Sequence, residues 1–101
     1  MGRLVREALP VLHDYARKGG KRSRKDQVKR ALRFASFAEG LGARAWEQVG
    51  KRHVVRFYRH LEAQDLSPST IYRYELAIRV LWQQLGLKGK PPPFHGAPRK
   101  Q

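Results

Sequence analysis

The sequence predicts an all-α protein, a compact bundle of four helices, or of five if the first predicted helix divides at Pro10. Apolar residues recur at helical spacing in four separate segments, as expected of helices that each bury one face. β-branched residues are sparse and fit the same helical period, so no segment is predicted as a strand. With 101 residues, 41% of them hydrophobic, the chain is expected to form one domain with an adequate core.

The first predicted helix covers residues 3–17, with apolar residues at helical spacing. Pro10 either kinks this helix or starts a second short one. Residues 18–25 follow as a basic break that contains Gly19 and Gly20, and the two glycines are expected to end the helix. We interpret this break either as a solvated linker or as an arm that contacts phosphate. Ser23 is a candidate cap for the next helix.

The second and third helices are predicted over residues 24–40 and 51–64. The apolar face of the second helix consists of Val28, Ala31, Leu32, Ala35 and Ala38, with Phe34, Phe37 and Leu41 beside it. The apolar stripe of the third consists of Val54, Phe57, Tyr58 and Leu61. Small residues on the second helix allow a neighbouring helix to approach closely. Between the two helices, Trp46 and Val49 are expected to fill the edge of the core.

The fourth helix, within residues 66–87, is marked at both ends. Ser67 is a good N-cap, Pro68 suits the first helical position, and Gly86 suits a left-handed C-cap. The buried stripe between the caps is predicted to contain Ile71, Tyr74, Ile78, Leu81 and Leu85. The tail that follows, residues 88–101, is rich in proline and basic residues. We expect it to be disordered or to lie along the domain, anchored by Phe94.

The charge balance is the strongest global signal. The chain has 22 Lys and Arg against 8 Asp and Glu, a formal net charge of +14, so nucleic acid is the leading class of partner. An anionic membrane surface is a weaker alternative, and no apolar run approaches the roughly 20 residues that span a bilayer. The absence of cysteine excludes disulfide scaffolds and fits a reducing cytoplasm. We expect a cytoplasmic, nucleoid-associated protein.

No group of residues predicts catalysis, a cofactor or a metal site. The four histidines His13, His53, His60 and His95 have no carboxylate pair or third ligand beside them. Tyr72 and Tyr74 flank Arg73, but the sequence supplies no set of cations and no general acid that would activate a tyrosine nucleophile. We therefore predict that the chain is not an enzyme, with no cofactor and no metal.

The cations form a better candidate site, because apolar stripes that face inward force the basic side chains outward. Short hydroxyls at the positive end of the fourth helix, followed by arginines, suit phosphate. The predicted DNA-binding residues are Lys21, Arg22, Arg24, Lys25, Lys29, Arg33, Arg52, Arg56, Ser67, Ser69, Thr70, Tyr72, Arg73 and Arg79. Arg59 extends the strip formed by Arg52 and Arg56. We divide the chain into an N-terminal helix and basic break (1–23), a DNA-binding helical core (24–87) and the tail (88–101).

The run from Lys25 to Leu87, about two thirds of the chain, resembles the SAM-like core-binding domain of tyrosine recombinases of the phage-integrase type. The carrying motifs are ALRFASFAEGLG, then AWEQVGKRHVVRFYRHLEAQDLSPSTI, then ELAIRVLWQQLGL. The best local signature is Ser67-Pro68-Ser69-Thr70-Ile71 before Leu76-Ala77-Ile78-Arg79. The resemblance implies a four- or five-helix domain that clamps duplex DNA. It also implies that Ser69, Thr70 and Arg73 approach the DNA.

The recombinase family has a catalytic domain after this one, whereas this chain stops at Gln101. The leading hypothesis is a non-catalytic double-stranded DNA-binding protein, an accessory or regulatory factor of a mobile element. A second is the excised DNA-binding module of a recombinase, which requires the reading frame to continue past Gln101. A third is an adaptor that docks a larger DNA-processing complex, with a recombinase or another DNA-processing protein as partner, through an exposed apolar patch around Trp82, Phe94 and the proline run. RNA binding stays open, because basic helices do not distinguish duplex types.

Overall fold

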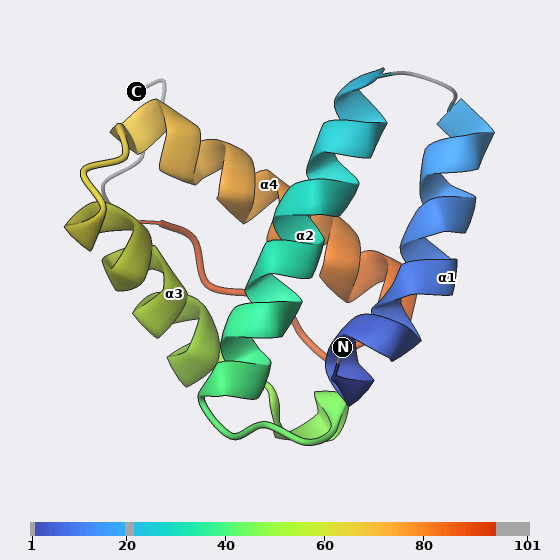
Figure 1. The fold of residues 1–101 in the computed structure, drawn as a ribbon, viewed down its shortest axis with the longest axis horizontal. Coiled ribbons are helices and arrows are strands. Elements are labelled where there is room, and N and C mark those ends of the chain that lie inside the picture. Colours follow the sequence, from blue (N-terminus) through green and yellow to red (C-terminus); the bar gives the residue numbers. More distant parts are fainter. Residues whose placement is uncertain (1, 20–21, 95–101) are drawn as a thin grey trace.

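The computed structural model describes residues 2–19 and 22–94, and these form an all-α bundle. Its elements are α1 (Arg3–Gly19), α2 (Arg22–Gly40), the short 3-10 helix η1 (Trp46–Gln48), α3 (Lys51–Ala63) and α4 (Pro68–Leu85). Helices α1 and α2 run antiparallel side by side, α3 lies on the opposite side of α2, and α4 crosses behind them (Figure 1). The predicted all-α fold with four α-helices is confirmed, and no strand occurs in the described ranges.

Helix α1 is one continuous helix through Pro10, so the division into five helices is wrong. Proline removes the hydrogen bond to the carbonyl of Arg6 and crowds the preceding turn. Pro10 lies on the exposed side of the helix, where water can satisfy that carbonyl. The burial of Leu4, Ala8 and Leu12 along the inner side holds the helix together across the proline.

The predicted basic break is also wrong over most of its length. Helix α1 continues to Gly19 and α2 begins at Arg22, so Ser23 lies inside the first turn of α2 rather than capping it. Positions 20 and 21 lie outside the described residues. The two helices also contact each other here. The guanidinium of Arg24 donates to the carbonyl of Tyr15 at 2.9 Å and lies 4.4 Å from the centre of its ring.

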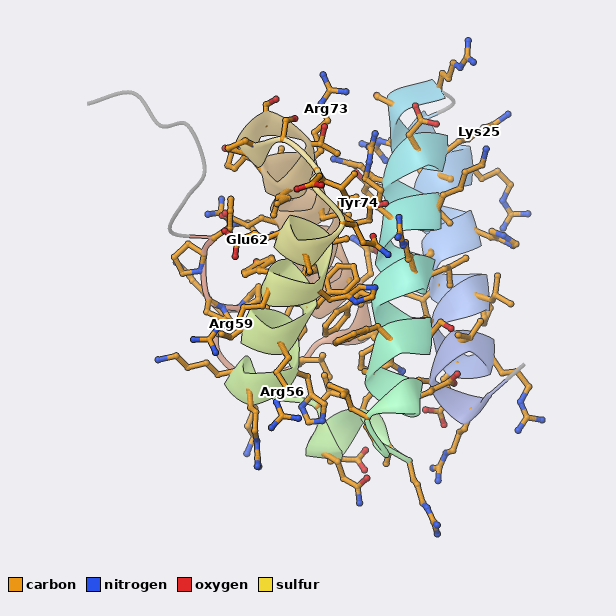
Figure 2. All side chains as sticks on the ribbon, turned by 60° about the vertical axis from the view of Figure 1, so that its left-hand side comes forward. Lys25, Arg56, Arg59, Glu62, Arg73 and Tyr74 are labelled. Atoms are coloured by element: carbon orange, nitrogen blue, oxygen red, sulfur yellow. The ribbon has the colours of Figure 1, made fainter. Side chains whose placement is uncertain are left out.

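Helix α3 keeps its apolar stripe inward and its cations outward. Val54, Phe57, Tyr58 and Leu61 are all buried, as predicted. The labelled side chains of Arg56 and Arg59 project away from the bundle in Figure 2. The side chain of His53 accepts a hydrogen bond from the N–H of Gly50 at 3.1 Å and so satisfies a donor just before the first turn.

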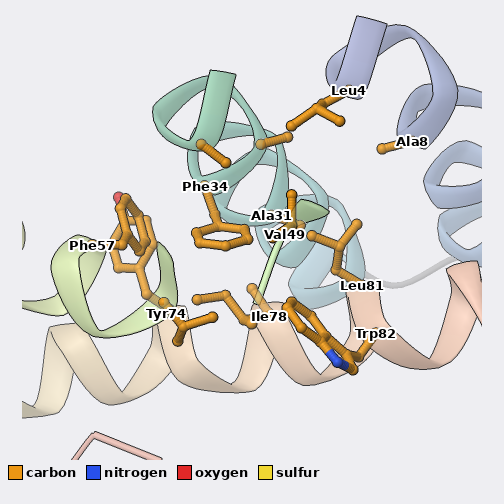
Figure 3. Close-up of a cluster of buried hydrophobic side chains, with 14 of the residues drawn as sticks. Leu4, Ala8, Ala31, Phe34, Val49, Phe57, Tyr74, Ile78, Leu81 and Trp82 are labelled. Carbon is orange, nitrogen blue, oxygen red and sulfur yellow. The ribbon is translucent and has the colours of Figure 1, made fainter. Parts of the chain in front are cut away.

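The core lies between α2, α3 and α4 and is continued by α1 (Figure 3). Phe34 is its centre: its ring lies 5.3 Å from that of Phe57 and 6.3 Å from that of Trp82. Trp46 and Val49 are buried as predicted, and the indole N–H of Trp46 donates to the carbonyl of Leu4 at 3.2 Å. The core therefore reaches from the η1 connector to the start of α1.

Two apolar residues of the second helix segment do not lie where the sequence places them. Leu41 is 38% exposed, because α2 ends at Gly40 and the next residue already belongs to the turn. Leu32 is only half-buried, on a stripe of α2 that faces away from α4. The predicted apolar face of α2 is therefore rotated, with Phe34 at its centre and Leu32 at its edge.

Helix α4 has the caps that the sequence predicts. The Ser67 hydroxyl accepts from the N–H of Thr70 at 3.2 Å, and Gly86 has a φ of 66°, in the left-handed region. After α4 the chain turns back along the bundle, and Phe94 anchors it as predicted. The ring of Phe94 is 5% exposed and meets that of Tyr58 edge to face at 5.5 Å.

The returning tail changes one prediction. Trp82 and Phe94 are only 7% and 5% exposed, so the apolar patch proposed around them for an adaptor is not exposed. The Tyr58 hydroxyl donates to the carbonyl of Pro92 at 2.9 Å, which ties the proline run to α3. The tail is thus part of the fold as far as Phe94. Residues 95–101 lie outside the described part of the chain.

Candidate nucleic-acid interface

Six of the ten predicted DNA-binding cations lie on three separate surfaces, together with three cations outside the predicted set, Arg17, Arg30 and Arg59. We call these surfaces the α2–α4 face (Arg30, Arg33 and Arg73), the α3 strip (Arg52, Arg56 and Arg59) and the α1–α2 groove, whose rim carries Arg17, Lys25 and Lys29. The cations of α2 separate because residues 25 and 29 share one side of the helix, whereas residues 30 and 33 share another.

The α2–α4 face is the most organised of the three. The guanidinium of Arg33 donates to the Tyr74 hydroxyl at 2.8 Å and to the side-chain oxygen of Gln64 at 2.8 Å. Its central carbon also lies 5.6 Å from the centre of the Tyr74 ring, and that of Arg30 lies 6.0 Å from the same ring. These contacts fix one guanidinium and hold the second nearby, at a junction of α2, α3 and α4.

Beside Tyr74 the surface is hollowed. A pocket of about 240 Å³ is lined by Arg30 and Arg73, with Leu76 at one wall and Asp26 as its one acidic lining residue. Within the described residues, the guanidinium of Arg73 makes no hydrogen bond and no ion pair. Figure 2 shows Arg73 near the N-terminal end of α4. Two arginines therefore converge on a pocket with a single carboxylate, an arrangement that favours an anionic ligand.

The hydroxyls at the N-terminus of α4 fix the first turn. The Ser67 hydroxyl donates to the Thr70 hydroxyl at 2.9 Å, besides accepting from its N–H, and it lies 3.2 Å from the Ser69 hydroxyl. Ser67 is therefore engaged in the cap, while Ser69 is exposed and Thr70 half-buried. The positive end of the α4 dipole points toward the same end of the bundle as Arg73.

The α3 strip is exposed and carries uncompensated charge. Arg52, Arg56 and Arg59 make no ion pair with any described residue. A pocket of about 230 Å³ is lined by Arg52, His53 and Arg56 together with the loop that follows α2. Partial burial, and then the charges of Arg52 and Arg56, lower the pKa of His53 below its ordinary value. The neutral form of the imidazole is thus favoured next to two arginines.

Several predicted site residues do not join the α2–α4 face. Arg24 packs on Tyr15, as described above. Arg79 lies on the opposite flank of α4, where its guanidinium donates to the carboxylate of Glu75 at 2.5 Å. Glu75 is fully buried and its second oxygen accepts from the N–H of Phe94 at 2.9 Å. The charge of Arg79 is therefore compensated by a buried carboxylate.

The other predicted residues are placed as follows. Arg22 is exposed at the first position of α2, and Tyr72 is half-buried on the flank of α4 away from Arg73. Lys25 and Lys29 belong to the α1–α2 groove. Lys21 lies outside the described residues. The structure thus pairs Arg52 with Arg56 and Lys25 with Lys29, whereas Arg33 and Arg73 are linked through Arg30, which lies at the Tyr74 ring with Arg33 and lines the pocket with Arg73.

Sequence reasoning left Arg30 out of the predicted site. Arg30 lines the same pocket as Arg73 and lies close to the ring of Tyr74. Its position was available as a signal, because Arg30 precedes Arg33 by three residues and so shares a side of α2 with it. The missing information was that this side of α2 faces the beginning of α4.

Comparison with protein-family models, curated proteins and solved structures finds no match to this chain. The resemblance to the integrase core-binding domain therefore stays a prediction from its motifs. No helix among the described residues is long and apolar enough to cross a membrane. Within the same residues, no group of three or more histidines, aspartates or glutamates could hold a metal ion.

Proposed function

We propose that the chain is a non-catalytic protein that binds double-stranded DNA through the α2–α4 face. The observation that carries the proposal is that Arg30 and Arg33 lie at the Tyr74 ring, while Arg30 also lines a pocket together with Arg73. Guanidiniums bind phosphate oxygens in a planar, bidentate geometry, and an arginine already fixed by hydrogen bonds loses less conformational entropy on binding. The net charge of +14 supplies long-range attraction, to which the α3 strip contributes.

A duplex is favoured over single strands by the position of the aromatic side chains. Proteins that bind single-stranded nucleic acid stack bases on exposed aromatic rings. Here Trp46, Trp82, Phe34 and Phe57 are buried in the core, and Phe94 is covered by its contact with Tyr58. Tyr15, Phe37 and Tyr72 are half-buried, so the described aromatic residues are all at least partly covered, and a surface of arginines of this kind suits a phosphate backbone with ordered spacing. Between DNA and RNA duplexes, the resemblance to integrase domains favours DNA.

The same resemblance supports the proposed setting. We propose an accessory or regulatory factor of a mobile element, cytoplasmic and associated with the nucleoid, working beside a recombinase. The alternative is the DNA-binding module of a tyrosine recombinase, for which the discriminating observation is whether the reading frame continues past Gln101. The adaptor alternative loses the exposed patch around Trp82 and Phe94 on which it depended.

The test is a fluorescence anisotropy titration of labelled duplex DNA, single-stranded DNA and duplex RNA, each over a salt series. Arg73→Ala removes an exposed guanidinium from the α2–α4 face. Arg6→Ala, which removes one from the exposed side of α1, is the matched control for net charge. We expect Arg73→Ala to weaken duplex binding about tenfold, the loss of one charge-assisted contact. It should also reduce the slope of log K against log salt by about one, and Arg6→Ala should do neither.

Two outcomes would reject the proposal. Weak binding to all three nucleic acids is one. The other is an equal loss in Arg73→Ala and Arg6→Ala, because it would show that only net charge matters. Tighter binding of duplex RNA than of duplex DNA would leave the α2–α4 face as the proposed binding surface but would make RNA its ligand. Incubation of the chain with supercoiled DNA tests the non-catalytic part, since a nicked or relaxed product would contradict it.

A further inference from the structure

The α1–α2 groove differs from the other two cationic surfaces in having an apolar floor. It is a cleft of about 680 Å³ between the second half of α1 and the first half of α2. Its floor is formed by Ala16, Val28 and Leu32. Leu32 and Ala16 are half-buried hydrophobic residues that pack against the edge of the core. The groove is therefore a solvent-facing extension of the core surface.

The rim of the groove is cationic. Arg17 lies on the α1 side, and Lys25 and Lys29 lie on the α2 side, while no carboxylate lines the groove. Arg17 makes an exposed ion pair with Asp14 at 3.3 Å, and Asp14 also pairs with Lys18 at 3.2 Å. Lys25 and Lys29 have no ion pair with any described residue. Both lysine charges are thus available to a partner.

We propose that the α1–α2 groove docks an acidic amphipathic helix of a partner protein, with its apolar face on Leu32 and Val28 and its carboxylates on Lys25, Lys29 and Arg17. Charge complementarity selects this occupant: a second copy of this chain, at a net charge of +14, would be repelled. From residue 25 to residue 32 the floor and rim extend along α2 for roughly 10 Å, which matches about two turns of a helix.

Phosphate explains this groove less well than a helix does. A nucleic-acid backbone gains nothing from an apolar floor, whereas helix-in-groove recognition combines apolar anchors at helical spacing with flanking charges. Lysine is also a point charge on a flexible stem, which adapts to carboxylates at varied positions, whereas on the α2–α4 face Arg33 is held by two hydrogen bonds. The chemistry of the two sides of α2 therefore differs.

The groove and the α2–α4 face are lined by different residues of α2. Residues 25, 29 and 32 follow one stripe of the helix, and residues 26, 30 and 33 follow another. The inference thus goes beyond DNA binding and does not depend on it. If both hold, the domain would connect duplex DNA to an acidic protein.

The experiment uses two fluorescein-labelled synthetic peptides of identical composition, each about four helical turns long. In the first, leucines recur at helical spacing on one face with glutamates on either side. In the second, the same residues are rearranged so that the leucines are spread around the helix. Binding to the full chain is measured by anisotropy. The variants are Lys25→Glu with Lys29→Glu, and a matched control with the same charge change on the α3 strip, Arg52→Glu with Arg56→Glu.

We expect the amphipathic peptide to bind with a micromolar Kd and the rearranged peptide about tenfold more weakly or worse, because its leucines cannot reach the floor together. The Lys25 and Lys29 variant should lose about tenfold for the amphipathic peptide, since two favourable rim contacts become repulsive. The control variant should change by less than about threefold, as expected when only screened long-range attraction is lost. Leu32→Ser should weaken peptide binding without changing duplex binding.

Three results would overturn the proposal. The first is no binding of the amphipathic peptide at millimolar concentration. The second is equal binding of both peptides, or an equal loss in the two charge-reversal variants, because charge alone would then explain the affinity. The third is a loss of duplex DNA binding in the Lys25 and Lys29 variant with the peptide affinity unchanged, which would make the groove a phosphate surface. If the charge-reversal variant melts early, Lys25→Gln with Lys29→Gln replaces it.

Discussion

Two flanks of α4 each carry an exposed arginine, but only one of these two arginines is paired with a carboxylate of the described residues. Arg73 faces the pocket beside Arg30 and has no carboxylate partner among the described residues. Arg79, six positions later, donates to the fully buried carboxylate of Glu75. Both arginines are exposed, and both follow helical spacing that keeps them out of the core. Only the neighbouring segments distinguish them: α2 beside Arg73, and the returning tail beside Arg79.

This difference teaches that a cation count measures attraction but not the location of binding. A paired guanidinium has already exchanged water for a carboxylate, so a phosphate that takes it must leave Glu75 buried without that partner. A guanidinium such as Arg73, beside another arginine, gains when a phosphate arrives. The same helix therefore has one flank suited to an anionic ligand and one flank suited to holding the tail.

The largest expected effect comes from removing the side chain that anchors the tail to the bundle. Phe94→Ala removes a ring that is 5% exposed and that packs on Tyr58, so we expect a loss of about 3 kcal/mol in the free energy of unfolding. Urea denaturation measures it, with Lys90→Ala, an exposed position of the same tail, as the control. Duplex binding by the folded protein should stay the same. A loss under about 1 kcal/mol would mean that the tail does not hold the fold.

The second prediction compares alanine variants of the two arginines, Arg73 and Arg79, in the free energy of unfolding and in duplex binding. Arg73→Ala should leave the free energy of unfolding within about 0.5 kcal/mol of the original, as for other exposed positions, while it weakens duplex binding. Arg79→Ala should lower the free energy of unfolding by about 1 kcal/mol, a value reduced for its half-exposed side chain, and leave duplex binding nearly unchanged. Denaturation and anisotropy on the same preparations provide both values. If either variant affects both measurements equally, the two flanks are not functionally separate.

How much of this was predictable differs between backbone features and surface features. The caps of α4 at Ser67 and Gly86 could be predicted, because capping depends on the residue itself and its nearest neighbours in sequence. The buried stripe of α3 followed in the same way from spacing. The start of α2 could not, because the contact of Arg24 with Tyr15 joins two helices across a glycine pair that locally indicates a break.

The candidate site was predictable only as a set of cations. Helical spacing shows that a charged residue faces outward, but it does not show which helix lies next to it. Lys29 and Arg30 are neighbours in sequence, yet one lies at the rim of the groove and the other beside Tyr74. The pairing of Glu75 with Arg79 had a local signal, a separation of four residues, whereas the hydrogen bond that Glu75 accepts from the tail at Phe94 had none. The partition into surfaces required the tertiary structure.

A smaller effect is expected from the hydrogen bond between Arg33 and Tyr74 on the α2–α4 face. Tyr74→Phe keeps the ring in the core and removes the hydroxyl that accepts from Arg33, leaving the contact of Arg33 with Gln64. We expect duplex binding to weaken about twofold, corresponding to about 0.5 kcal/mol, because Arg33 becomes less fixed. Tyr58→Phe, which loses a hydroxyl bonded to Pro92, is the control and should leave duplex binding unchanged. Equal binding by Tyr74→Phe and the original would show that fixing Arg33 is irrelevant.

The smallest effect concerns His53, which lies next to the arginines of the α3 strip. Partial burial, with the charges of Arg52 and Arg56, lowers the pKa of His53 below 6.5 in the folded chain. The unfolded chain therefore binds the proton more readily. Stability is fully present above pH 6.5 and declines as the pH falls toward the lowered pKa of the folded state. Protonation would also cost the hydrogen bond that the ring accepts from Gly50.

Thermal melts between pH 7.5 and pH 5 of the original chain and of His53→Gln test this. Glutamine can accept from Gly50 at every pH, as it does in a capping box, so this variant should lose less stability on acidification. Arg52→Ala should also flatten the profile, because it removes one of the charges that oppose protonation. Identical pH profiles in all three proteins would mean that the α3 arginines do not act on His53.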